Sequence, residues 1–147
     1  TSFAASLDLE GGIHPRDTAA YSKRLSDQAL ALVYGQSIAY AGPIYSSMEI
    51  EPSTIRIHYR AGTAEGLTAQ GGGPIQGFAI TEDNVTWHWA DAYTDGNDIL
   101  LSSASAPNPI GARYAWENRP TWANLVNDSG LAASAFATDA TPGEYGP

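Results

Sequence analysis

A histidine at position 14 has the sequence surroundings of a catalytic base. Gly11 and Gly12 precede it, and glycine reaches backbone conformations that other residues avoid. Pro15 fixes its own φ angle and favours an extended conformation for His14. We therefore predict a sharp loop, from which the imidazole could take up and return a proton in a cleft. Without further signals, a loop histidine is more often a capping or packing residue.

The element that positions this histidine is a helix that begins directly after it. Asp17 can cap the helix through its side-chain oxygen, and Gly35 suits its end. Between them, apolar residues recur at the spacing of one helical face. They are Tyr21, Leu25, Ala29, Leu32 and Val33. Apolar and polar residues alternate within residues 1–10, as in a short strand or extended arm. Since no further helix–strand alternation follows, residues 1–36 are predicted to be the final piece of an α/β domain.

These residues resemble a known family. The stretch DLEGGIHPRD…RLSDQALALVYG is similar to the C-terminal histidine block of the SGNH/GDSL hydrolases, and more specifically of sialate O-acetylesterases and related carbohydrate acetylesterases. The resemblance continues in AGPIYSSMEIEPSTIRIHY, GFAITEDNVTWHWADAYTDGNDILLSS, NPIGARYAWENRP and ANLVNDSGLAASAFATD, and so runs from about Leu7 to Asp139. It implies that His14 is the general base and acid of a serine esterase, and that an all-β region follows the hydrolase domain.

The residues that would orient the histidine depart from the family pattern. SGNH hydrolases often carry Asp-x-x-His, and related acetylesterases an acid two residues before the histidine. This sequence has Gly11 and Gly12 at those positions. Glu10 and Asp8 are the nearest upstream acids, and either could turn toward the imidazole. A backbone carbonyl could do the same and leave a Ser-His dyad.

The nucleophile serine and the oxyanion hole have no matching block. Residues 35–37 spell Gly-Gln-Ser, but they follow a helix, whereas a Gly-x-Ser nucleophile motif follows a strand and opens a helix. We therefore expect a second polypeptide, or a missing N-terminal part, to supply both. A processed enzyme whose two fragments stay associated is a further possibility. Exposed apolar helix positions such as Leu25 and Leu32 would then pack against the partner.

The remaining sequence is typical of a β-sandwich. The whole chain is 43% hydrophobic, with 15 Gly and 9 Pro. This composition suits short strands and turns better than a helical bundle. Strands are expected at residues 44–50, 55–59, 75–80, 86–93, 99–102, 110–116 and 124–126. The expected fold is therefore mixed: a histidine loop and helix of an α/β hydrolase domain (1–36), a β-sandwich (37–139) and a tail (140–147).

Four tryptophans offer a second kind of chemistry, the stacking of aromatic rings on sugars. Trp122 lies in an expected loop beside Arg119 and Pro120 and is the candidate for substrate binding. Trp87 and Trp89 alternate along one expected strand, and Trp116 ends another. Large aromatic residues at such positions more often fill the core, so these three are predicted to be core residues.

Composition excludes several partners. The chain has 7 Lys and Arg against 16 Asp and Glu, a net charge of −9, which argues against nucleic acid and anionic membrane surfaces. It has no cysteine and no His-x-x-x-His motif, so no metal is expected, and the resemblance implies no cofactor. We expect an esterase that removes O-acetyl groups from sialic acid or other carbohydrates, with a secreted or periplasmic location favoured. The alternative is a non-enzymatic β-sandwich module for carbohydrate binding or assembly.

Overall fold

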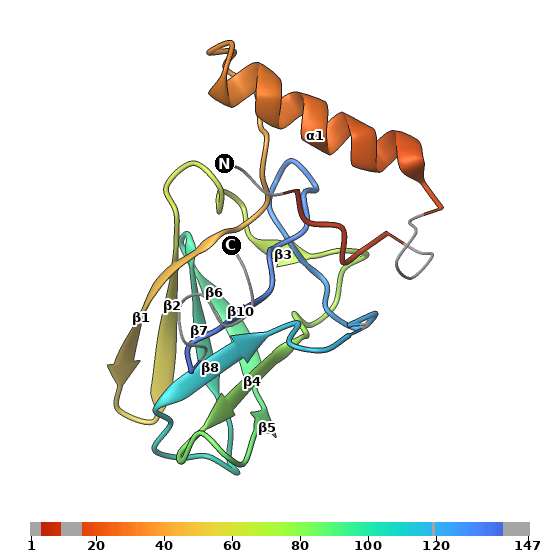
Figure 1. Ribbon diagram of the computed structural model, residues 1–147. Coiled ribbons are helices and arrows are strands. Elements are labelled where there is room, and N and C mark those ends of the chain that lie inside the picture. Colours follow the sequence, from red (N-terminus) through yellow and green to blue (C-terminus); the bar gives the residue numbers. More distant parts are fainter. Residues whose placement is uncertain (1–3, 10–15, 119, 140–147) are drawn as a thin grey trace.

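The computed structural model describes residues 4–9, 16–118 and 120–139. In Figure 1 the helix lies apart from the strands. The helix α1 spans Thr18–Leu32. The strands of the described residues are β1 (Tyr45–Glu51), β2 (Thr54–Tyr59), β3 (Thr68–Ala69), β4 (Phe78–Thr81), β5 (His88–Trp89), β6 (Asp91–Asp95), β7 (Asp98–Ser102), β8 (Gly111–Tyr114), β9 (Leu125–Val126) and β10 (Phe136–Ala137).

Both ends of α1 follow from local chemistry. Asp17 Oδ1 accepts a hydrogen bond from the backbone N–H of Ala20 at 2.9 Å, so the predicted N-cap is confirmed. The helix ends at Leu32, three residues before the glycine that the sequence favoured as its end. Gly35 has a φ angle of 68°, and across it the N–H of Gln36 donates to the carbonyl of Leu30 at 3.0 Å. The glycine therefore turns the chain just after the helix.

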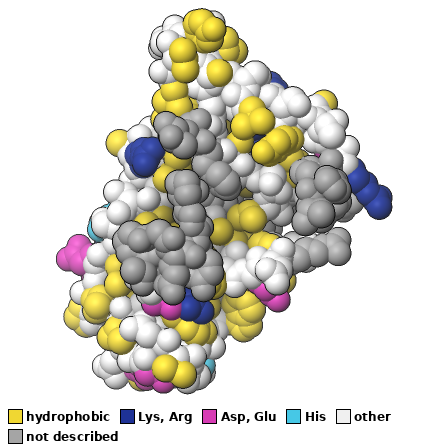
Figure 2. Space-filling view, viewed as in Figure 1, with side chains coloured by type: hydrophobic (Ala, Val, Ile, Leu, Met, Phe, Trp, Pro, Cys, Tyr) yellow, Lys and Arg dark blue, Asp and Glu magenta, His cyan; other side chains and the backbone are white. Residues whose placement is uncertain are grey.

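The apolar face of α1 is exposed among the described residues. Leu25 is 45% exposed and Leu32 is 52% exposed, and Val33 directly after the helix is 75% exposed. The buried helix residue is the polar Gln28. Figure 2 shows hydrophobic side chains at the surface over this end of the molecule, at the top of the view. An amphipathic helix normally turns its apolar stripe toward a core, so this face is available to a partner surface.

The strands form two four-stranded antiparallel sheets and one short pair. The strand orders are β1-β2-β7-β6 and β10-β8-β4-β5, and β3 pairs with β9. Only Ala90 separates β5 from β6, so the chain changes sheets there, and its N–H donates to the carbonyl of Phe78 at 3.1 Å. The single strand expected at 86–93 is therefore wrong. The predicted β-rich character is confirmed, whereas the domain boundaries and the α/β sheet around residues 1–36 stay predictions.

The core lies between the inner faces of the two sheets. In a strand, successive side chains point to opposite faces, so alternate residues share the core. Completely buried residues of this kind are Ile55 and Ile57 of β2, Ile99 and Leu101 of β7, and Phe78 and Ile80 of β4. The pairs Ile55–Leu101 and Ile57–Ile99 lie opposite each other across β2 and β7. This register fixes which residues between them face outward.

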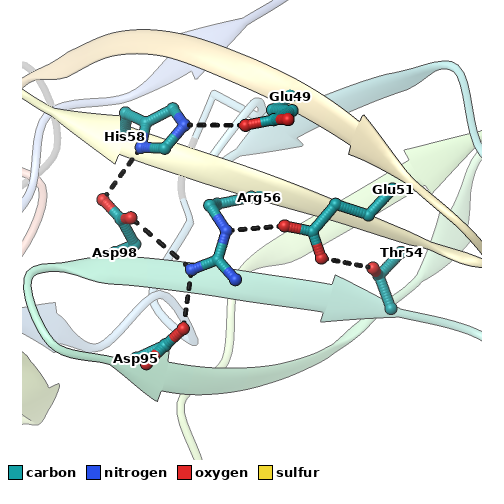
Figure 3. A network of polar contacts seen from close by, with 7 residues as sticks. All are labelled: Glu49, Glu51, Thr54, Arg56, His58, Asp95 and Asp98. Atoms are coloured by element: carbon teal, nitrogen blue, oxygen red, sulfur yellow. Dashed lines mark hydrogen bonds and ion pairs between the residues drawn. The ribbon is translucent and has the colours of Figure 1, made fainter.

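A network of charged side chains covers the outer face of the first sheet (Figure 3). Arg56 of β2 donates through Nε to Glu51 of β1 at 2.6 Å, and through Nη1 to Asp95 of β6 at 2.7 Å. These hydrogen bonds, the one to Asp95 first, raise the pKa of the Arg56 guanidinium. His58 Nδ1 lies 3.1 Å from Asp98 Oδ1 of β7. The network links all four strands of this sheet on its solvent side.

The hydroxyl of Tyr59 is buried without a hydrogen-bond partner among the described residues. Its burial raises the pKa of the phenol well above the ordinary value. An unsatisfied buried hydroxyl costs about 1–3 kcal/mol. We therefore expect Tyr59→Phe to raise the free energy of unfolding by about 1 kcal/mol in urea denaturation. Tyr93→Phe, at a 60% exposed position, should leave it unchanged. A loss of stability in Tyr59→Phe would contradict the assignment.

Candidate functional site

The segment around the predicted catalytic histidine is described only on its two sides. His14 and Glu10 lie outside the described residues. On the N-terminal side, both carboxylate oxygens of Asp8 accept hydrogen bonds from Arg24 of α1, with Nη1–Oδ1 and Nη2–Oδ2 distances of 2.7 and 2.6 Å. Arg24 Nη1 also donates to the carbonyl of Ala5 at 2.6 Å. The chain before the histidine is thus fastened to the helix that follows it.

This ion pair gives Asp8 a structural role. The side chains of Arg24 and Asp8 are only 15% and 10% exposed, and their hydrogen bond raises the pKa of Arg24. A bidentate pair of this kind has a fixed geometry. The role of Asp8 or Glu10 in orienting the imidazole stays a prediction. Ser37 lies in an exposed irregular segment after α1, and not between a strand and a helix as a nucleophile motif requires.

A cleft on the outer face of the second sheet brings together all four tryptophans of the chain. They are Trp87, Trp89, Trp116 and Trp122. The cleft has a volume of about 280 Å³, close to the lower end of the range for small-molecule sites. The prediction that the first three are core residues is wrong, because Trp89 is 66% exposed and the buried core contains none of them. The structure places Trp122, the binding candidate from the sequence, beside them.

The register of β5, β4 and β8 explains why the cleft faces outward. Trp89 lies opposite Ala79, and Ala79 lies opposite Arg113, so the three form one row across the sheet. The neighbours of Ala79 in the chain, Phe78 and Ile80, point into the core, which leaves this row on the solvent side. Ala79 and Gly77 form a floor of small residues between the large side chains.

Contacts between side chains fix the walls of the cleft. The Trp89 and Trp122 rings meet edge to face, with centroids 4.8 Å apart and planes at 80°. The Arg113 guanidinium carbon lies 3.8 Å from the centroid of the Trp87 ring, a cation–π contact. Arg113 also binds both oxygens of Asp139, with an Nε–Oδ1 distance of 2.9 Å. This pairing lowers the pKa of Asp139. The aromatic rings are therefore held in place before any ligand binds.

A tight turn delivers Trp87 to the cleft. Asp83 Oδ1 accepts hydrogen bonds from the backbone N–H groups of Thr86 at 2.7 Å and Val85 at 2.8 Å, and from the Thr81 hydroxyl at 3.0 Å. The bonds to Thr86 and Val85 lower the pKa of Asp83 from 3.8 to about 2. Because the pKa of Asp83 is lower in the folded than in the unfolded protein, its carboxylate stabilises the fold at pH values above its ordinary pKa. That contribution decreases as the pH falls below 3.8 and is lost as the pH falls through about 2.

Sequence reasoning missed Arg113, Ala79 and the exposed carboxylate of Glu117, which also line the cleft. The available signal was the single cation in the otherwise uncharged stretch from 110 to 116. In the described part of the chain, no three His, Asp or Glu side chains cluster in a way that could hold a metal ion. No helix there is long and apolar enough to cross a membrane.

Comparison with known proteins relates the chain to solved structures. No family model matches the chain, and no curated protein matches it. Among solved structures, a carbohydrate acetylesterase from Xanthomonas citri is similar to it, with a TM-score of 0.88 and 28% sequence identity over 94% of this chain. The aligned region is 32% of that chain, so this protein spans about a third of its length. The chain is therefore related in structure to a carbohydrate esterase.

Proposed function

We propose that this protein is part of a serine esterase that removes O-acetyl groups from carbohydrates. The observation that carries the proposal is the structural similarity to a carbohydrate acetylesterase over 94% of this chain. The ordered sequence blocks from Leu7 to Asp139 lead to the same enzyme class. The tryptophan cleft supports carbohydrate as the ligand, since indole rings stack on the C–H faces of sugars.

In this proposal His14 moves the protons of the reaction. It accepts the proton of the serine hydroxyl as the serine oxygen attacks the acetyl carbonyl carbon. It then gives that proton to the sugar oxygen when the ester bond breaks, which leaves an acetyl-serine. Water hydrolyses the acetyl-serine with the same histidine as base, and acetate leaves. Asp8, Glu10 or a backbone carbonyl orients the imidazole.

The serine and the oxyanion hole come from outside this chain, in a second polypeptide or in a larger part of the same enzyme. Two observations support this. The chain spans only 32% of the acetylesterase that it matches. The apolar face of α1, with Leu25 and Leu32, is exposed among the described residues and suits a covering domain. The helix would then connect the histidine loop to the surface that carries the nucleophile.

Mass spectrometry combined with an activity assay tests the proposal. The intact mass of every polypeptide in the purified sample is measured beside acetate release from an acetylated oligosaccharide. We expect acetate release whenever a polypeptide with a strand–Gly-x-Ser–helix block accompanies residues 1–147. The complete assembly with that block present, but without acetate release, would contradict the proposal. Release by this chain alone would place the nucleophile within it and contradict the split site.

The second candidate function is a non-enzymatic carbohydrate-binding module. The tryptophan cleft favours it, because its binding surface is complete within the described residues and needs neither His14 nor a serine. Glycan binding by this chain, with no hydrolase polypeptide associated and no acetate released, would select this function over the esterase.

A further inference from the structure

We propose that the tryptophan cleft is a binding site for uncharged pyranose chains, and that it rejects sialic acid and other acidic sugars. The inference deepens the proposed function and rests on it, because it names the class of carbohydrate that the esterase would hold. The cleft is a docking surface on the second sheet, formed by β4, β5, β8 and the loop that carries Trp122. It would hold the glycan chain beside the acetylated residue.

The first argument is the shape and chemistry of the lining. A pyranose ring presents apolar C–H faces and polar hydroxyl edges, and therefore suits a surface with large aromatic planes and few polar groups. Trp89 is 66% exposed, whereas Phe78 and Ile80 on the inner face of the same sheet are completely buried. Leaving so large an apolar side chain in water is unfavourable unless a ligand covers it. Small residues at the floor leave room for a ring to enter.

The second argument is the charge of the cleft. Arg113 is the one cation among the described lining residues, and Asp139 already occupies its guanidinium while the Trp87 ring lies against it. Glu117 adds an exposed carboxylate. The described charges near the cleft thus sum to negative, in a chain of net charge −9. A sugar carboxylate would meet repulsion here, whereas a sugar hydroxyl can donate a hydrogen bond to a carboxylate.

The third argument is that the cleft is formed in advance. Asp83 holds the turn before Trp87, and the contact between Trp89 and Trp122 joins β5 to the loop after β8. A binding surface whose side chains are already ordered loses little conformational entropy when a ligand binds. Trp89 is thus both exposed and held in position, whereas aromatic residues of the core are buried.

Tryptophan emission tests the inference directly, because every tryptophan of the chain lies in the cleft. The protein is titrated with neutral hexaoses (cello-, xylo- and mannohexaose) and, separately, with 3′-sialyllactose and a galacturonic acid oligomer. We expect at least one neutral hexaose to change the emission with a Kd of about 10 µM to 1 mM, and both acidic sugars to bind at least tenfold more weakly. Isothermal titration calorimetry gives the affinities of the variants.

Matched variants locate the site. Trp89→Ala and Trp122→Ala should each weaken binding of the neutral hexaose about tenfold, because each removes one stacking surface. Tyr93→Ala removes a 60% exposed aromatic side chain of β6, which does not line the cleft, and should leave the affinity unchanged. The inference is overturned if no neutral hexaose binds at millimolar concentration, if both tryptophan variants bind normally, or if sialyllactose binds as tightly as the neutral sugar.

Acetate release, measured on the same samples, separates this inference from the proposed function. Hydrolysis by the complete assembly without glycan binding in the cleft would overturn the inference and leave the esterase standing. Binding of neutral sugars without hydrolysis by any assembly would support the inferred binding site and contradict the proposed esterase function.

Discussion

His14→Ala is expected to lower acetyl-ester hydrolysis by the complete assembly about a thousandfold or more, because the variant can no longer accept the proton of the attacking serine. The loss should fall on kcat rather than on KM, since the imidazole acts on the reacting atoms and not on the glycan chain. Acetate release from an acetylated oligosaccharide at saturating substrate measures the effect. Free imidazole added to the variant should restore part of the rate.

The chain contains two further histidines that serve as controls. His58 lies on the outer face of the first sheet beside Asp98, and His88 lies in β5. His58→Ala and His88→Ala should keep hydrolysis within about twofold of the starting protein, since neither belongs to the predicted histidine block. Full activity in His14→Ala, with its folding verified by circular dichroism, would refute the catalytic assignment.

Phe78→Ala is expected to reduce the free energy of unfolding by about 3–5 kcal/mol, as is usual when a buried aromatic side chain is truncated. Phe78 is completely buried, and its ring lies 4.7 Å from that of Tyr114 and 6.3 Å from that of Phe136, between centroids. Removal of this ring leaves a cavity between the sheets. Urea denaturation followed by circular dichroism measures the loss.

Two milder substitutions keep this prediction testable if the alanine variant does not fold. Phe78→Leu retains much of the apolar volume and should cost about 1–1.5 kcal/mol. Val85→Ala, at an 80% exposed position, should change the stability by less than about 0.5 kcal/mol. Equal stability of Phe78→Leu and Val85→Ala would show that the inner face of β4 does not organise the core.

The parts of the fold that the sequence predicts are those set by neighbours in the chain. Asp17 caps α1 because its side chain reaches an N–H three residues later. Ile55 and Ile57 mark β2 because alternation is a property of one segment. In contrast, β3 and β10 are two residues each, too short to show a period. Each is defined by its pairing with a strand distant in the sequence, β3 with β9 and β10 with β8.

The candidate site could be predicted less well, because it depends on how the strands pair. Alternation correctly places Trp87 and Trp89 on one face of their segment, but it cannot say which face is buried. The pairing of Trp89 with Ala79 decides that, and it depends on the register between β5 and β4. Arg113 joins the site only because β8 lies beside β4. Trp122 could be proposed from its loop position, but its contact with Trp89 depends on the tertiary fold.

The ion pair between Arg24 and Asp8 closes a ring across a sequence separation of 16 residues, and His14 belongs to that stretch of sequence. A cross-link of this kind lowers the number of conformations open to the enclosed chain, and the entropy cost of closure grows only slowly with its length. In the proposed enzyme, a hydrolase domain that docks on α1 would meet a chain that is already linked between Asp8 and Arg24. Less of the docking energy would then be consumed in ordering that stretch of chain, and more would remain as affinity between the two proposed parts.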